Sequence, residues 1–278
     1  MEADRPVVSF GPALRFVGHL LLGLLCVVTL LPMLLVVGTA FKPADEIYSI
    51  TPWPLRPTLE NFARIFEGSF AIYLWNSFGT TVLRVTGQII IAILAAYAFA
   101  RWEFRGRDIL FACVLGALMV PHTLTMIPIY LMIAELGWFD TWTALIVPNL
   151  AFPFGVFLLR QHMLSFPKEL LEAAAVDGAG PFKALWSIVI PNLGPAIAGL
   201  VIVAVIETWN EYFWPLLVTD SDRMRTIQLG IRRFLESDGG ENYGPLMAGV
   251  TVASLPVLIL FFILQRRVMQ TFVSSGIK

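Results

Sequence analysis

The chain has 278 residues, of which 57% are hydrophobic and only 14% are charged, and its formal net charge at pH 7 is −1. Several apolar runs are far longer than a soluble core helix needs, so the composition indicates an integral membrane protein and argues against a soluble domain. The near-zero net charge gives no indication of a nucleic-acid partner.

Six apolar segments reach or approach the length that crosses a bilayer. A hydrocarbon core about 30 Å thick calls for roughly 20 apolar residues at about 1.5 Å each. In chain order, the predicted spans are 14–41, 74–100, 109–134, 142–159, 194–218 and 246–264. Prolines and glycines within them are tolerated in lipid-embedded helices. We therefore predict one all-α transmembrane domain, residues 1–278, with both termini on the same side of the membrane.

The positions of Lys and Arg predict the orientation of these spans, because short loops rich in these residues stay cytoplasmic. The loop 101–107 decides it, since it holds Arg101, Arg105 and Arg107. The other basic residues on the same side are Arg5, Arg15, Arg160, Lys168, Lys183, Arg266 and Arg267. Both termini are therefore predicted to be cytoplasmic.

Two longer loops fall on the opposite, external side. In the loop 42–73, Thr58 is a plausible N-cap for a short surface helix. The apolar face of that helix is predicted to carry Leu59, Phe62, Ile65 and Phe66. The loop 219–243 is dense in charge, with Asp220, Asp222, Arg223, Arg225, Arg232, Arg233, Asp238 and Glu241. It either meets a soluble partner or is only a solvated connection.

A polar hairpin, residues 165–191, separates the fourth and fifth spans on the cytoplasmic side. Ser165 and Pro167 suit the start of a first short helix, and the sequence "DGAGP" ends it at Gly178. A second short helix is predicted to begin near Pro181. Exposed alanines would let the backbone of a partner approach closely, and nearby carboxylates offer charge for docking.

The hairpin resembles the "EAA" signature of the membrane subunits of binding-protein-dependent ABC importers. That signature is Glu-Ala-Ala, three residues, Gly, nine residues, Ile, one residue and Leu-Pro. The matching residues here are Glu172, Ala173, Ala174, Gly178, Ile188 and Pro191. Ile190 replaces the leucine, an apolar exchange, and both spacings are kept.

Other segments resemble the second permease subunit of the carbohydrate-uptake branch of that family. They are "TAFKP" at 39–43, "NSFGTT" at 76–81, "AAYAFAR" at 95–101, "WNEYFWPLL" at 209–217 and the ending "QRRVMQTFVSSGIK". The resemblance implies the type I ABC importer permease fold in a bacterial-type inner membrane. It also implies a solute such as an oligosaccharide or a polyol phosphate of the glycerol-3-phosphate type.

The resemblance further implies a machine of five chains. The partners of this chain would be a second, different permease, two copies of a cytoplasmic ABC ATPase and an external solute-binding protein. The sequence contains no glycine loop ending in Gly-Lys-Ser or Gly-Lys-Thr, so we expect no enzyme activity and no cofactor here, with ATP and Mg²⁺ handled by the ATPase.

In this interpretation the hairpin seats in a groove of the ATPase. The resemblance implies that Glu172, Ala173, Ala174, Asp177, Gly178, Ile188 and Pro191 form the coupling site. We hypothesise that Glu172 makes a charge-assisted contact to a basic residue of the ATPase and that Gly178 sets the angle between the two short helices.

Charged residues within spans are expensive and are therefore functional candidates. Glu207 and Glu211 are predicted to share one face of the fifth span, and Arg84 lies at a depth that permits an Arg84–Glu207 pair. The neighbouring candidates are Trp209, Asn210, Trp214 and, in the fourth span, Asn149. These residues either make a structural ion pair or line the solute pathway.

No metal site is expected. Cys26 and Cys113 fall within predicted spans without metal-type spacing. His19, His122 and His162 likewise show no ligand spacing, and helix packing explains His122 beside Pro121 equally well.

Three other classes of function compete with this prediction. An ion-coupled secondary transporter would use Glu207 and Glu211 as proton carriers, but it leaves the hairpin unexplained. An intramembrane enzyme would need a nucleophile and base, or a metal motif, which the sequence does not offer. An ABC importer for amino acids or metals is the nearest competitor, and the carbohydrate-branch segments disfavour it.

Overall fold

The computed structural model describes residues 11–236 and 243–276. Over those residues the regular structure is helical and contains no β-strand, so the predicted all-α fold is confirmed. The chain divides into two compact units, Met1–Ile65 with Phe234–Thr251 and Phe66–Arg233 with Val252–Lys278. Three charged residues used above, Arg5, Asp238 and Glu241, lie outside the described residues.

The first unit begins with α1 (Pro12–Ala40), which corresponds to the first predicted span. Its buried residues are Gly38 and Ala40, at the C-terminal end. A Cβ added to Gly38 would lie 2.0 Å from the carbonyl oxygen of Pro52, so only glycine allows the following loop to approach this helix so closely.

A short helix, α2 (Glu60–Phe66), follows that loop where the sequence predicts one. Thr58 Oγ1 accepts a hydrogen bond of 3.1 Å from the second backbone N–H after it, which confirms the predicted cap. The buried residues of the helix are Asn61 and Ile65. Because Leu59 is 67% exposed, the predicted apolar face is correct only in part.

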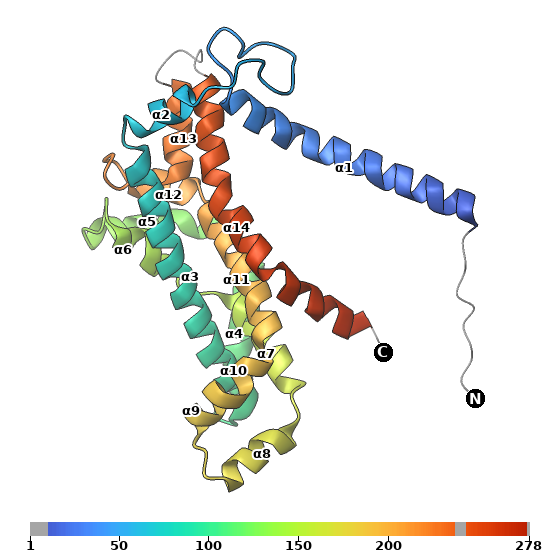
Figure 1. Ribbon diagram of the computed structural model, residues 1–278. Coiled ribbons are helices and arrows are strands. Elements are labelled where there is room, and N and C mark those ends of the chain that lie inside the picture. The colour runs from blue at the N-terminus through green and yellow to red at the C-terminus, as the bar shows by residue number, and fades with distance from the viewer. Residues whose placement is uncertain (1–10, 237–242, 277–278) are drawn as a thin grey trace. The chain divides into compact units, whose positions relative to one another are not determined.

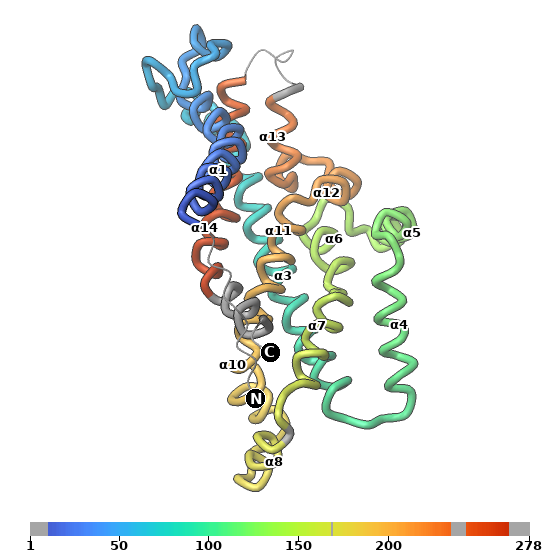
Figure 2. Tube along the Cα trace, turned by 90° about the vertical axis from the view of Figure 1, so that its right-hand side faces the viewer, coloured from blue at the N-terminus to red at the C-terminus, as the bar shows by residue number. Residues whose placement is uncertain are grey.

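The long helix α3 (Phe70–Arg101) is the centre of the second unit. It packs against α7 (Pro153–Leu164) and α11 (Gly194–Trp209), and Figures 1 and 2 show the three helices side by side. Ala92 and Ala96 on α3 are completely buried, and small residues at such positions let helix backbones approach closely. The core also contains Ile89, Ile93, Val156, Leu159, Leu185, Leu200 and Ala204.

The predicted span 109–134 is two helices rather than one. α4 (Arg107–Met119) and α5 (His122–Glu135) meet at an angle of 102°. The break falls at Val120, whose ψ of 115° is extended, immediately before Pro121. The proline ring disfavours a helical conformation in the residue that precedes it, which explains the bend.

The predicted span 194–218 is also interrupted. α11 ends at Trp209, and α12 (Phe213–Val218) begins only after a short non-helical stretch. Pro215 has no N–H to donate to the carbonyl of Glu211, so a continuous helix would leave that group without its intrahelical partner. The two carboxylates that the sequence places on one helical face therefore do not share a helix.

The remaining helices complete the chain. They are α6 (Trp142–Ile146) with the 3-10 turn η1 (Val147–Asn149), then α13 (Ile227–Glu236) and α14 (Tyr243–Gly276). Within the described residues, three helices are long and apolar enough to cross a membrane, or up to six if each bent pair counts as one span.

Candidate functional site

The hairpin has two short helical limbs at the positions that the sequence predicts. α8 (Lys168–Val176) forms the first limb and α9 (Pro181–Ala184) starts the second. A π-helical segment, η2 (Leu185–Val189), and α10 (Ile190–Asn192) continue the second limb toward α11. α8 begins directly after Pro167, and the Ser165 hydroxyl donates to the carbonyl of His162.

The turn between the limbs is built on Gly178, whose φ is +76°. Its N–H donates to the carbonyl of Ala175 at 3.1 Å, and the N–H of Ala179 donates to the carbonyl of Ala174 at 2.8 Å. These two bonds form a Schellman motif, which satisfies the last carbonyls of α8. No atom lies within 4 Å of a Cβ added to Gly178, so the requirement for glycine is one of backbone conformation rather than space.

The residues of the EAA signature divide between the core and the surface. Ala174 is only 7% exposed, so the expectation of exposed alanines does not hold for this residue. Glu172, Ala173 and Asp177 are exposed. Further along, Gly178 and Pro191 are exposed as well, and Ile188 is half-buried. The hairpin therefore presents two carboxylates and a glycine turn on one projection, at one end of the unit in Figure 1.

Arg84 forms an ion pair with Glu211, not with Glu207. Arg84 Nη1 lies 2.8 Å from Glu211 Oε2, and the two side chains are only 12% and 13% exposed. Glu207 is exposed. The predicted Arg84–Glu207 pair is wrong because α11 ends at Trp209, which turns Glu211 away from the face that carries Glu207.

The two tryptophans near this pair are packing residues in the structure. Trp209 is 3% exposed and Trp214 is 1% exposed. Their indole N–H groups each donate at 2.9 Å to a backbone carbonyl, that of Ala253 and that of Ala144 respectively. Asn210 is exposed, and its amide nitrogen donates to the carbonyl of the residue four positions earlier. The ring atoms of both tryptophans are thus shielded from any solute in this conformation.

Asn149 joins three helical segments. The amide of Gln88 on α3 donates to its backbone carbonyl at 2.7 Å, and its own Oδ1 lies 3.3 Å from His122 Nε2. His122 is the first residue after the bend between α4 and α5. The structure therefore brings together two residues that the sequence offered only as separate, weaker candidates, and it places them at the break in the third span.

Gln88 is a buried polar residue that the sequence analysis missed. It is 5% exposed, and its Oε1 is buried without a hydrogen-bond partner, as is Nε of Arg84 one turn earlier. The sequence could have indicated Gln88, because it lies four residues after Arg84 and both are polar residues within an apolar span. Residues at this spacing share one face of a helix.

The loop that precedes α13 is organised by two aspartates. Asp140, whose φ is +58°, accepts hydrogen bonds of 3.0 Å from the backbone N–H groups of Asp220 and Ser221. Asp222 pairs with Arg225 at 2.8 Å and with Arg233 in the last turn of α13. The hydrogen bond from Arg233 is the main cause that lowers the pKa of the Asp222 carboxyl, and burial opposes it. The loop 219–226 is thus a folded, charge-paired structure.

Asp222→Asn is expected to destabilise this loop by roughly 0.5 kcal/mol at pH 7, because half-exposed ion pairs contribute little. Folding lowers the pKa of Asp222, so its contribution is present above the ordinary carboxyl pKa of about 3.9 and is lost as the pH falls through the lower folded value. Thermal unfolding in detergent from about pH 7 to pH 3 should show the variant and the wild type converging on acidification.

Asp220→Asn provides the matched control, since it removes the same charge from the same loop and Asp220 contacts its neighbours through its backbone. It should leave the unfolding temperature unchanged. A destabilisation by Asp222→Asn that stays constant over the whole pH range would contradict the assigned role of its charge.

Comparison with known proteins places these features in context. Residues 88–273 match the family described as "Binding-protein-dependent transport system inner membrane component". The arabinooligosaccharides transport system permease protein AraQ of Halalkalibacterium halodurans is 32% identical over 257 residues, which cover 90% of this chain and 92% of that protein. The sn-glycerol-3-phosphate transport system permease protein UgpE of Brucella suis is 31% identical over 271 residues, with coverage of 94% and 96%.

Solved structures share the fold. A chain in the crystal structure of a bacterial ABC transporter involved in the import of the acidic polysaccharide alginate superposes with a TM-score of 0.82. It is 21% identical, and the alignment covers 93% of this chain and 98% of that one. A chain of a bacterial alginate ABC transporter in complex with pentasaccharide-bound periplasmic protein gives a TM-score of 0.60 at 17% identity, with coverage of 90% and 92%.

Proposed function

Because this chain belongs to the family of binding-protein-dependent transport system inner membrane components, we propose that it forms half of the membrane pathway of an ATP-driven importer for a carbohydrate or sugar-like solute. The observation that carries the proposal is the hairpin, in which the EAA residues surround a Schellman turn at Gly178. A projection of this kind is suited to receive force from a separate protein.

The other half of the pathway would come from a second, different permease subunit. Two copies of a cytoplasmic ABC ATPase would bind ATP and Mg²⁺, since this sequence has no Gly-Lys-Ser or Gly-Lys-Thr loop of its own. An extracytoplasmic solute-binding protein would deliver the solute to the external loops, including the charge-paired loop around Asp222. The chain itself would bind no cofactor.

The proposed orientation has the hairpin and both termini in the cytoplasm of a cell with a bacterial-type inner membrane. The support is the basic loop 101–107 and the position of the hairpin at the same end of α3 as that loop, which Figure 2 shows. Closure of the ATPase pair would move the hairpins of the two permease subunits together and open the solute pathway to the outside. ATP hydrolysis would then reset the pathway.

Among the solute classes, a neutral carbohydrate is favoured over a polyol phosphate. The names of the relatives cover both an arabinooligosaccharide permease and a glycerol-3-phosphate permease. Arg84 is the charge in the second span that would suit a phosphate, but Glu211 already neutralises it at 2.8 Å. A pair without net charge offers little attraction to an anion, so this chain contributes no phosphate site through Arg84.

The same pair argues against an ion-coupled secondary transporter. In that function Glu211 would serve as a free proton carrier, whereas in the structure its carboxylate forms an ion pair with Arg84 at 2.8 Å. The other proposed carrier, Glu207, is exposed and lies in α11, whereas Glu211 lies beyond the end of that helix.

The proposal is tested by reconstituting the chain with its permease, ATPase and solute-binding partners in liposomes. Uptake of the solute carried by the binding protein should require ATP on the side of the membrane where the ATPase lies. It should stop when the ATPase is inactivated. The loaded binding protein should also stimulate ATP hydrolysis. Uptake that follows an ion gradient and proceeds without ATP would refute the assignment.

A further inference from the structure

The last turns of α3 are joined to the hairpin by a tyrosine. Tyr97 is 5% exposed, and its hydroxyl donates to the backbone carbonyl of Pro181 at 3.2 Å. The ring of Trp102 lies edge-on to the tyrosine ring, with 5.1 Å between the ring centroids. The hydroxyl group is therefore held in a fixed place at the end of a 32-residue helix.

Its acceptor is the first residue of the second limb. Pro181 starts α9 directly after the turn at Gly178, and its carbonyl also accepts the N–H of Leu185. One oxygen thus serves both the helical bonding of α9 and the link to α3. A displacement of the turn must move this carbonyl, and the carbonyl is tied to Tyr97.

The route along the chain from the hairpin to the membrane is interrupted. After α9 come the π-helical segment 185–189, Pro191 and an angle of 78° between the second limb and α11. Breaks of this kind absorb displacement, because π segments and prolines allow local changes in helical bonding. The contact from Pro181 to α3 bypasses all three breaks.

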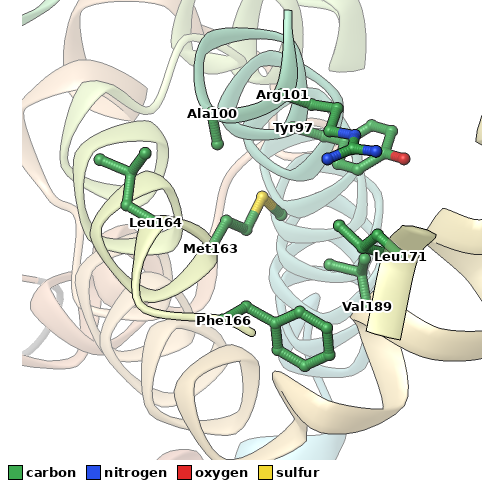
Figure 3. A pocket seen from close by; sticks show the side chains of 8 residues that line it. All are labelled: Tyr97, Ala100, Arg101, Met163, Leu164, Phe166, Leu171 and Val189. Carbon is green, nitrogen blue, oxygen red and sulfur yellow. The ribbon is translucent and has the colours of Figure 1, made fainter. Parts of the chain in front are cut away.

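A small cavity adjoins this contact. Its volume is about 50 Å³, and its walls come from the end of α3, the end of α7 and both limbs of the hairpin. Figure 3 shows Tyr97, Leu171 and Val189 on one side of this space and Phe166 and Met163 on the other. Leu185 and Val189 of the second limb lie in the same buried core as Tyr97, so packing also holds this limb near α3, and the hydrogen bond to Pro181 is the polar link beside the cavity.

The other end of α3 is anchored to the external loop. The amide of Asn76 donates to the carbonyls of Arg223 and Arg225 at 2.8 and 3.0 Å. The indole N–H of Trp142 donates to the side-chain oxygen of Asn76 at 3.1 Å. A movement that enters α3 near Tyr97 therefore reaches the charged loop through one unbroken helix.

We propose that Tyr97 is a positioning residue that fixes the hairpin to α3 through the carbonyl of Pro181, so that movement of the hairpin is passed directly to this span. The inference rests on the proposed function, because it assumes that the hairpin receives force from an ATPase. It adds a second, direct mechanical connection to the covalent one through α11.

Tyr97→Phe tests it, since the substitution removes only the hydroxyl and keeps the ring. In the complete reconstituted complex, assembly, unfolding temperature and the KM for uptake should match the wild type. Stimulation of ATP hydrolysis by the loaded binding protein, and the solute transported per ATP, should both fall about fivefold, the factor expected for one hydrogen bond. A residue with only a structural role would change assembly and not this ratio.

Two further variants complete the experiment. Tyr130→Phe removes a hydroxyl from another span and should leave the ratio unchanged. Pro181→Ala keeps the acceptor carbonyl and should retain most of the coupling, and a loss as large as that in Tyr97→Phe would refute the role of this carbonyl. If the wild type shows stimulation of ATP hydrolysis by the loaded binding protein and Tyr97→Phe matches it, this inference alone is overturned. If the wild type itself shows no stimulation, the proposed function is overturned and the inference with it.

Discussion

Gly178→Val is expected to reduce solute uptake tenfold or more while the complex still assembles. The residue has a φ of +76°, a conformation that a β-branched side chain rarely adopts, so valine would open the Schellman turn. The two limbs of the hairpin would then lose their fixed angle, and the ATPase would no longer move the helices. Uptake and binding-protein-stimulated ATP hydrolysis, both in proteoliposomes, are the measurements.

Two control variants test whether the effect comes from the backbone conformation at Gly178 rather than from replacing a glycine as such. Gly178→Asn should retain much of the activity, because asparagine tolerates the left-handed conformation better than other residues. Gly180→Ala should be close to the wild type, since Gly180 has a φ of −66° and nothing lies within 4 Å of an added Cβ. Normal transport and normal coupling in Gly178→Val would show that the hairpin turn has no role in the mechanism.

Arg84→Ala is expected to lower the stability of the bundle by about 3 kcal/mol, because it leaves the carboxylate of Glu211 nearly buried and without its counter-ion. The partner is 13% exposed in the intact pair, so little water is available to replace the arginine. The yield of the assembled complex and its unfolding temperature in detergent should both fall.

A double-mutant cycle identifies the partner of this arginine. Adding Glu211→Ala to Arg84→Ala should restore much of the lost stability, since no unpaired charge then remains. Glu207→Ala should change stability by less than about 0.5 kcal/mol, as expected for an exposed residue. Normal assembly of Arg84→Ala together with an altered solute KM would instead identify Arg84 as part of the solute pathway.

The parts of this protein that the sequence predicts well are those that depend on neighbouring residues. The hairpin is an example, because the sequence "DGAGP" carries its own stop signal and Gly178 is the residue that the turn requires. The cap at Thr58 is another. The apolar spans follow from length and composition alone, since lipid imposes the same requirement on each of them.

The parts that the sequence predicts poorly depend on where helices stop and on what lies beside them. Periodicity places Glu207 and Glu211 on one face only if the helix continues, and it ends at Trp209. The 102° bend before His122 follows from a proline, but many prolines in spans cause much smaller bends. The contact between Tyr97 and Pro181 joins residues 84 positions apart, which no local pattern records.

The turn at Gly178 is closed by main-chain N–H and carbonyl groups alone, and no group in those bonds titrates or carries a net charge. Its shape should consequently be indifferent to buffer composition, whereas the loop around Asp222 also contains ion pairs that added electrolyte screens over about 10 Å at 0.1 M. Raising the ionic strength should weaken the ion pairs of this loop while the turn at Gly178 keeps its form.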